Sequence, residues 1–153
     1  FEVIADSGPV GAGAIARALA PEVTGAPALT LDGYAAARGS VRAALDGLAE
    51  AAGAWWSPAG DGLALRDAAT ATTELVPDPA RDTREVAAAD AAPAVVSLGY
   101  FDPARDWQAG LQRARRPGEG PTLALELPAA LSAGVAKGVA AAALRRAEAG
   151  RTR

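Results

Sequence analysis

The first 33 residues constrain the fold of this chain most strongly, because they alternate between extended and helical patterns. Residues 1–5 form an apolar run typical of a strand, and a glycine-rich turn followed by an apolar helix pattern occupies residues 8–20. A second strand pattern follows at 28–31, and Asp32 comes directly after it. Two short strands on either side of a helix are typical of a β-α-β unit with parallel strands.

The same alternation recurs along the rest of the chain. We expect strands at 1–5, 28–31, 94–101 and 122–127, and helices at 11–20, 34–52, 103–116 and 128–150. Asp102 is placed to cap the third helix with Pro103 at its first position, and Gly53 is placed to end the second. The sequence therefore predicts an α/β fold: a three-layer open, mainly parallel sheet of Rossmann or flavodoxin type.

Residues 63–76 are expected to interrupt this sheet with a small β-hairpin, and residues 54–57 could form a short strand before it. A turn cluster at 58–62 is followed by alternating segments at 63–66 and 70–76. Residues 77–92 carry proline and charge with few large apolar groups, which predicts a flexible connection. We expect residues 1–153 to form a single domain, and the start at Phe1, inside a strand pattern, favours a fragment of a larger chain.

The glycine turn carries a resemblance to a known family. Gly11-x-Gly13-x-x-Ala16, preceded by Gly8 and followed some twenty residues later by Asp32, resembles the opening of Rossmann-fold NAD(P)-binding domains, including short-chain dehydrogenases and reductases. The resemblance implies a pyrophosphate bound at Gly8, Gly11 and Gly13. It implies a ribose bound by Asp32, with NAD or NADP as the cofactor.

The catalytic residues of that family have no counterpart at the expected places. Its Tyr-x-x-x-Lys pair is missing, because Tyr34 is followed by Arg38 and Lys137 has no tyrosine partner. The chain also lacks histidine and cysteine, which excludes a Ser-His-Asp triad and thiolate chemistry within it. These gaps favour a degenerate, non-catalytic Rossmann-like module.

A second group of candidate residues follows from the predicted sheet. If the strands are parallel, their carboxyl ends meet at one edge, where open α/β sheets bind ligands. That edge would gather the predicted ligand-binding residues Asp6, Ser7, Ser97, Tyr100 and Asp102. A magnesium ion between Asp6, Asp32 and Asp102 is a weaker hypothesis, since each aspartate has a simpler role in a turn or a cap.

The tryptophans and the net charge limit which classes of partner the chain could bind. Trp55, Trp56 and Trp107 are interpreted as core or interface residues in a chain with few aromatics. A net charge of −3 argues against a nucleic-acid partner, and the apolar stretches are too short to span a membrane. We therefore expect other domains of a parent protein or a partner subunit, with a small-molecule ligand as a further candidate, in the cytoplasm.

Three functions remain open from the sequence. The first is a non-catalytic α/β module that binds a partner domain or a small ligand at the strand ends. The second is an NAD(P)-dependent oxidoreductase, or its nucleotide-binding half. The third is a receiver-like or solute-binding-like domain that uses the aspartates as its site.

Overall fold

The computed structural model describes residues 8–35, 39–68 and 92–149, which hold three helices and nine strands. The helices are α1 (Ala12–Leu19), α2 (Val41–Ala52) and α3 (Ala133–Ala149), with a short 3-10 helix at Pro103–Arg105. The strands are β1 (Val10–Gly11), β2 (Val23–Thr24), β3 (Thr30–Leu31), β4 (Gly33–Tyr34), β5 (Trp55–Ala59), β6 (Gly62–Arg66), β7 (Val95–Asp102), β8 (Gln108–Arg115) and β9 (Thr122–Ala130).

The strands form three separate sheets, mostly antiparallel. The largest has the order β4-β9-β7-β8, the second the order β2-β6-β5, and β1 pairs with β3 alone. Only β7 with β9 and β2 with β6 run parallel. The predicted three-layer, mainly parallel α/β fold is therefore wrong: the protein is a small, mostly β structure with mixed sheets and few helices.

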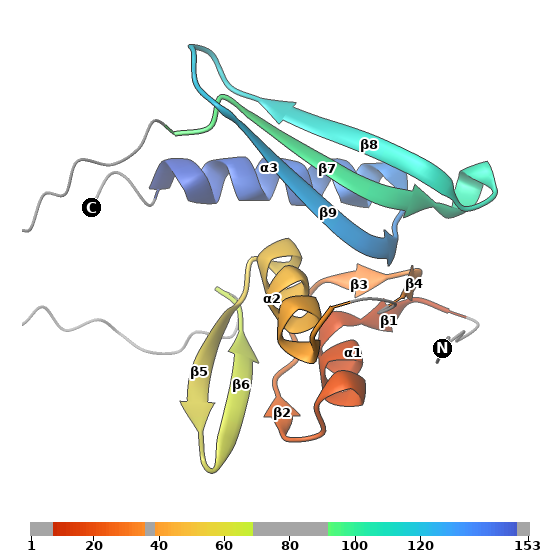
Figure 1. Cartoon of the computed structure of the whole chain (residues 1–153), viewed down its shortest axis with the longest axis vertical. Coiled ribbons are helices and arrows are strands. Elements are labelled where there is room, and N and C mark those ends of the chain that lie inside the picture. The colour runs from red at the N-terminus through yellow and green to blue at the C-terminus, as the bar shows by residue number, and fades with distance from the viewer. Residues whose placement is uncertain (1–7, 36–38, 69–91, 150–153) are drawn as a thin grey trace, which may run out of the picture.

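The main sheet is backed by α3 on one face. Figure 1 shows α3 lying along this sheet with α2 below it; strands β5 and β6 lie to the left of α2 in this view, and β1 and β3 to its right. Buried residues from all these layers pack into one cluster, which includes Ile15, Leu48, Leu98, Leu127 and Leu144. The many alanines of α3 allow the helix to approach closely, because a methyl group occupies little space between two backbones.

The chain between β7 and β8 turns back instead of continuing as the predicted helix at 103–116. Asp102 does cap a helix start, since its Oδ1 accepts a hydrogen bond from the Ala104 N–H at 3.0 Å, but only one 3-10 turn follows. Asp106 and Trp107 then take positive φ angles of 54° and 59°, which reverse the chain. Residues with good helix propensity are thus drawn into β8, because pairing with β7 outweighs that weak preference.

The closing helix also begins later than predicted. Pro128, expected to open it, lies within β9, and α3 starts at Ala133 after Ser132. The Ser132 Oγ accepts a hydrogen bond from the Val135 N–H at 3.4 Å. Proline is tolerated at this point because β9 is bordered there only by the two-residue strand β4 and is irregular opposite β7.

Helix α2 ends where the sequence predicted but begins later than predicted. Residues Gly33–Tyr34 form β4, and α2 begins only after Ser40, whose Oγ accepts from the Ala43 N–H at 3.2 Å. Gly53 ends the helix in the left-handed conformation at φ 64°. The N–H groups of Gly53 and Ala54 bond back to the last helical turn, which is the Schellman arrangement that glycine favours.

A hairpin does form in this region, but its strands are β5 and β6, so the segment predicted at 63–66 pairs with the strand before it. β5 pairs antiparallel with β6 through the turn at Gly60 and Asp61, so the two tryptophans at 55 and 56 belong to the hairpin itself. The predicted strands at 1–5 and 70–76, and all of the predicted connection at 77–92 except Ala92, lie outside the described residues.

Candidate functional site

One face of the main sheet is exposed, and it is the candidate functional surface of this protein. Side chains alternate across β7, so that Val96, Leu98 and Tyr100 are buried on the α3 side. Phe101 points to the opposite side, where it is 44 % exposed, and Leu111 on β8 is 53 % exposed. We call this side the open face; its members on β7, β8 and β9 are Val95, Ser97, Gly99, Phe101, Ala109, Leu111, Arg113, Arg115, Thr122, Ala124, Glu126 and Pro128.

The open face contains a shallow hollow of about 480 Å³. Its lining on this face consists of Gly99, Phe101, Ala109, Leu111, Glu126 and Pro128. Gly99 forms the floor because the Glu126 side chain lies across it: a Cβ added at Gly99 would stand 2.7 Å from the Glu126 Cδ. The hollow therefore has largely apolar walls, and the Glu126 carboxylate lies over its floor.

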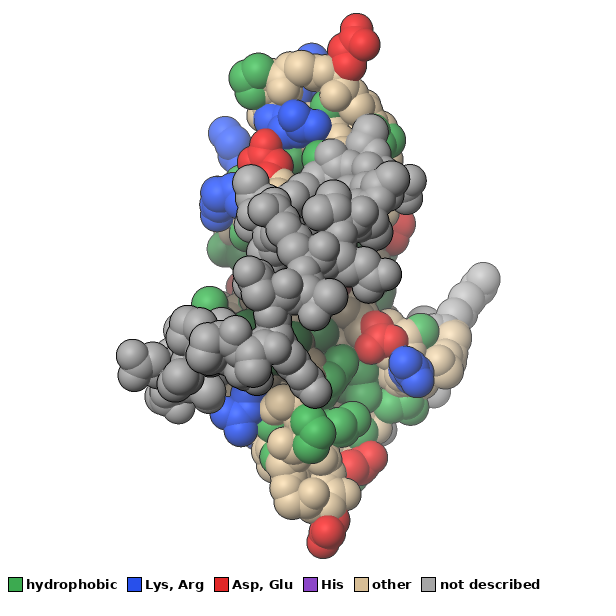
Figure 2. Space-filling view, turned by 90° about the vertical axis from the view of Figure 1, so that its left-hand side faces the viewer, with side chains coloured by type: hydrophobic (Ala, Val, Ile, Leu, Met, Phe, Trp, Pro, Cys, Tyr) green, Lys and Arg blue, Asp and Glu red, His purple; other side chains and the backbone are tan. Residues whose placement is uncertain are grey.

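Charge is distributed unevenly on this face. Arg113 and Arg115 are exposed on β8, while Glu126 is exposed on β9, on the other side of β7. Figure 2, which looks at the molecule from the left-hand side of Figure 1, shows basic and acidic side chains together in its upper part. Arg113 and Arg115 thus stand on the β8 side of the open face, while the Glu126 carboxylate lies across Gly99 near its middle.

The free edge of the sheet borders the same face. Within the described residues, β8 has β7 as its only neighbour, so the eight residues of β8 present an unpaired side. Exposed edge strands invite pairing with other chains, and charged side chains such as Arg113 and Arg115 limit that risk.

A third tryptophan stands at the end of this sheet. Trp107 is 56 % exposed and lies against Gly33 of β4, since a Cβ built on Gly33 would be 3.6 Å from the Trp107 Cζ3. Its indole therefore extends the apolar surface beyond Phe101. An interface role predicted for this residue stays a prediction, but its exposure fits such a role better than a core position.

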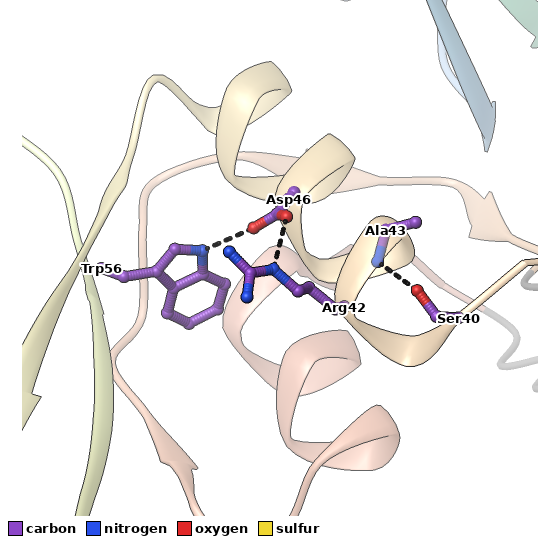
Figure 3. A network of polar contacts seen from close by, with 5 residues as sticks. All are labelled: Ser40, Arg42, Ala43, Asp46 and Trp56. Atoms are coloured by element: carbon purple, nitrogen blue, oxygen red, sulfur yellow. Dashed lines mark hydrogen bonds and ion pairs between the residues drawn. The ribbon is translucent and has the colours of Figure 1, made fainter.

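Of the two neighbouring tryptophans, Trp56 is half-buried and Trp55 is exposed. Trp56 is half-buried, and its Nε1–H donates to the Asp46 Oδ1 at 3.3 Å, which ties β5 to α2 (Figure 3). Asp46 also pairs with the Arg42 Nε at 3.5 Å. Trp55 points away and is 45 % exposed, so only one member of the pair serves as packing.

The predicted cofactor-binding residues lie near one another in sequence but have different environments. Gly8 and Gly11 are exposed or half-buried, with open space where a Cβ would stand. Gly13 is buried in α1, where a Cβ would overlap the Gly25 carbonyl oxygen, so packing against the Gly25 segment accounts for it. Asp32 is exposed, and its N–H donates to the Ala130 carbonyl at 2.9 Å.

The structure describes three of the predicted ligand-binding residues, and Ser97 lies on the opposite face of the main sheet from Tyr100. Ser97 belongs to the open face, Tyr100 is buried on the α3 side, and Asp102 is buried at the end of β7. Asp6 and Ser7 lie outside the described residues. Across the part of the chain that the structure describes, no three histidine, cysteine, aspartate or glutamate side chains gather as a metal site.

Burial raises the pKa of the Tyr34 phenol on β4. Its hydroxyl donates to the Ala44 carbonyl of α2 at 3.1 Å, so β4 is fastened both to β9 and to the second helix. The phenol faces a backbone carbonyl, so this hydrogen bond joins β4 to α2.

The fold and its open face define a small β-rich protein whose most developed surface is a sheet face. Comparison with known proteins gives the family: residues 40–153 match a family model described as "Putative phage tail protein". The match covers more than half of the chain, and the chain belongs to this family. No curated protein and no solved structure matches it.

The family membership corrects the earlier functional interpretation. The resemblance to Rossmann-fold NAD(P)-binding domains is wrong, and so is the function of a Rossmann-like nucleotide- or ligand-binding module derived from it. The glycine turn precedes a single helix whose flanking strands, β1 and β3, pair antiparallel. The parallel β-α-β arrangement that holds a pyrophosphate is therefore missing around it.

The expectation of partner domains or subunits agrees with membership of a tail-protein family, since tail proteins belong to a larger assembly. In the described part of the chain, none of the helices is both long and apolar enough to cross a bilayer.

Proposed function

We propose that this chain is a structural subunit of a phage-tail-like assembly, and that it works by non-covalent contacts with neighbouring subunits. Its membership of the tail-protein family across residues 40–153 carries this proposal. The open face supports it, because large side chains such as Phe101 and Leu111 are exposed beside charged groups. Monomeric proteins seldom leave such a surface without a partner.

The chemistry of the chain supports a binding role as well. The sequence contains no histidine or cysteine, and the described carboxylates do not gather around a common point. A shallow hollow of about 480 Å³ lies on the open face, with walls that are largely apolar. Contacts between protein surfaces use such apolar centres with a charged border.

The edge strand β8 offers a second route to association. An unpaired strand can extend the sheet of a neighbouring subunit through backbone hydrogen bonds. Arg113 and Arg115 would then select a partner strand with acidic side chains, since like charges directly opposite are destabilising.

The experiment is to follow self-association of the purified chain over a wide concentration range. Sedimentation velocity measures the size distribution, and negative-stain electron microscopy of the concentrated sample records ordered rings, discs or tubes. Concentration-dependent growth into one ordered particle class supports the proposal. A chain that stays monomeric at the highest concentration, with no ordered particles, contradicts a self-assembling subunit.

A further inference from the structure

The free edge of β8, which is the outer edge of the main sheet in Figure 1, exposes the backbone groups of every second residue. The Arg116 N–H donates to the Ala94 carbonyl at 3.0 Å, so the neighbouring pair, Arg115 opposite Val95, is not itself joined by hydrogen bonds. The two kinds of pair alternate along an antiparallel ladder, so the even-numbered residues of β8 bond to β7. The backbone groups of the odd-numbered residues therefore point to the free edge: Ala109, Leu111, Arg113 and Arg115.

The side chains of the same four residues stand on the open face, and all four residues are exposed. Two of them, Ala109 and Leu111, are apolar, and the two that follow, Arg113 and Arg115, are basic. A strand added antiparallel along β8 would place its own side chains directly opposite these four, with the paired Cα atoms about 5.5 Å apart. The edge can therefore select a partner by its side chains while it binds the partner's backbone.

The charge of this edge disfavours a second copy of β8 as the partner. Neither Arg113 nor Arg115 forms an ion pair within the part of the chain that the structure describes. An antiparallel second β8 would bring two more arginines to the same side of the extended sheet, and like charges on neighbouring strands are destabilising. Acidic side chains opposite the two arginines would instead form cross-strand pairs of opposite charge.

We propose that β8 binds, in antiparallel orientation, an extended segment of a neighbouring subunit that carries two acidic and then two apolar residues, each two positions apart. This inference rests on the proposed function, and it names the partner sequence for the edge contact. The acidic residues lie opposite Arg115 and Arg113, and the apolar residues lie opposite Leu111 and Ala109. The three residues between them face the α3 side of the sheet.

The test measures binding of labelled peptides to the full chain by fluorescence anisotropy. The peptide Glu-Thr-Glu-Thr-Val-Thr-Val should bind the wild-type chain, and Lys-Thr-Lys-Thr-Val-Thr-Val should not. In the double variant Arg113→Glu, Arg115→Glu, the Kd of the acidic peptide should rise by at least about tenfold, because two cross-strand pairs change from opposite to like charge. The double variant should bind the basic peptide instead, and an exchange of preference cannot arise from a folding defect.

A peptide of the same composition in another order tests the register. Glu-Thr-Val-Thr-Glu-Thr-Val moves one carboxylate from its place opposite Arg113 to a place opposite Leu111. It should bind the wild-type chain at least about threefold more weakly than the first peptide, since one charge pair is lost. Equal affinity of the two acidic peptides would show attraction by net charge alone and would overturn the proposed pairing.

A proline variant tests the backbone contact separately from the charges. The Leu111 N–H points to the free edge, so Leu111→Pro removes a donor for the partner strand and leaves the ladder to β7 intact. Leu111→Ala is the matched control, because it loses the same side chain and keeps the N–H. Leu111→Pro should abolish binding of the acidic peptide, while Leu111→Ala should retain it. Equal loss in both variants would contradict backbone pairing.

Amide hydrogen exchange of the complex gives a second reading of the same geometry. The acidic peptide should slow exchange of the Leu111 and Arg113 N–H groups by at least about tenfold, because they gain hydrogen bonds on binding. The Gln112 and Ala114 N–H groups already bond to β7 and should change little. Binding without this alternation would overturn the edge contact.

The outcomes separate this inference from the proposed function. Ordered particles that form from a wild-type chain with no preference for the acidic peptide overturn the edge contact and leave the structural role standing. Selective peptide binding by a chain that stays monomeric at every concentration supports the edge contact and contradicts the self-assembling subunit. A chain that neither binds the acidic peptide nor forms particles overturns both.

Discussion

Tyr100 on β7 lies over Gly110 on β8, its register partner, so closely that a Cβ on Gly110 would stand 2.6 Å from the Tyr100 Cζ. The ring is buried on the α3 side, and its hydroxyl lies 3.5 Å from the Gln112 Nε2. An aromatic ring that covers a glycine on the neighbouring strand protects the backbone there and fixes the register of the pair.

Gly110→Val should therefore destabilise the protein by about 1–3 kcal/mol, because the buried ring has to move to admit the side chain. Chemical denaturation followed by tryptophan fluorescence measures the free energy of unfolding. Ala109→Val is the control: it adds bulk to the same strand on the open face, away from the ring. Equal losses in both variants would show that the Tyr100 contact is not responsible.

Two helical glycines should be replaceable with a gain in stability. Gly47 in α2 and Gly134 in α3 have nothing within 4 Å of an added Cβ. Alanine at either position should stabilise the protein by about 0.5–1 kcal/mol, because glycine loses more backbone entropy in a helix. Thermal unfolding of the single and double variants measures the gain, and a lower melting temperature in either single variant contradicts this expectation.

Arg146 of α3 caps the carboxyl end of α2, where its Nη2 donates to the Glu50 carbonyl at 2.6 Å. A cation at this end also interacts favourably with the helix dipole. Arg146→Gln should cost about 0.3–1 kcal/mol, and the difference from wild type should shrink at high salt, which screens the charge. Arg145→Gln, the exposed neighbour, is the comparison; an equally large loss there would remove the capping explanation.

Arg116 directly follows β8, and its guanidinium holds the segment that leads into β7. Its Nε and Nη2 donate to the Pro93 and Ala92 carbonyls at 2.9 Å each, and its Nε lies 3.6 Å from the Glu148 Oε1. Arg116→Lys should lower the free energy of unfolding by about 1–2 kcal/mol, since one ammonium cannot reproduce the planar fork. Arg115→Lys, on the exposed face, should change it little; a neutral Arg116→Lys would contradict this role.

The raised pKa of Tyr34 predicts a loss of stability at high pH. Burial favours the neutral phenol in the folded state, so the folded pKa lies above the ordinary value of 10.0. Below pH 10 both states bind the proton and the effect is absent, while above it the unfolded state ionises first and unfolding becomes easier. Tyr34→Phe should therefore be less stable than wild type at neutral pH, where it lacks the Ala44 hydrogen bond, and the gap should narrow toward about pH 11. A gap that does not change with pH would contradict this linkage.

The sequence predicted individual elements of this protein better than their arrangement. The end of α2 at Gly53 and the apolar strands β7 and β9 follow from local signals that the structure confirms. Strand direction does not follow from them, because a buried apolar run has the same composition in either direction. The chain reversal at Asp106 and Trp107 allows β8 to pair with β7. No glycine in the sequence marks this reversal, because both residues adopt positive φ angles themselves.

The candidate surface was harder to predict than the fold. Gly11-x-Gly13-x-x-Ala16 has the spacing of a nucleotide-binding turn, but close packing of α1 against Gly25 requires the same small residue at 13. The open face is assembled from three strands whose residues become neighbours only through their register. Nothing local marks Glu126 and Arg113 as members of one surface, so only the register in the structure could identify it.

The pairing of β4 with β9 has a consequence for how this protein is made. Gly33 pairs with Ala130, so β4 finds its sheet partner only in a segment far downstream in the sequence. On the ribosome, β4 has to wait until β9 has emerged, and β7 has to wait for β9 in the same way. Loop closure over such a separation slows folding, and the sheet edges stay accessible to other nascent chains meanwhile. In this protein, β4 therefore joins its sheet only when β9, far downstream in the sequence, has been made.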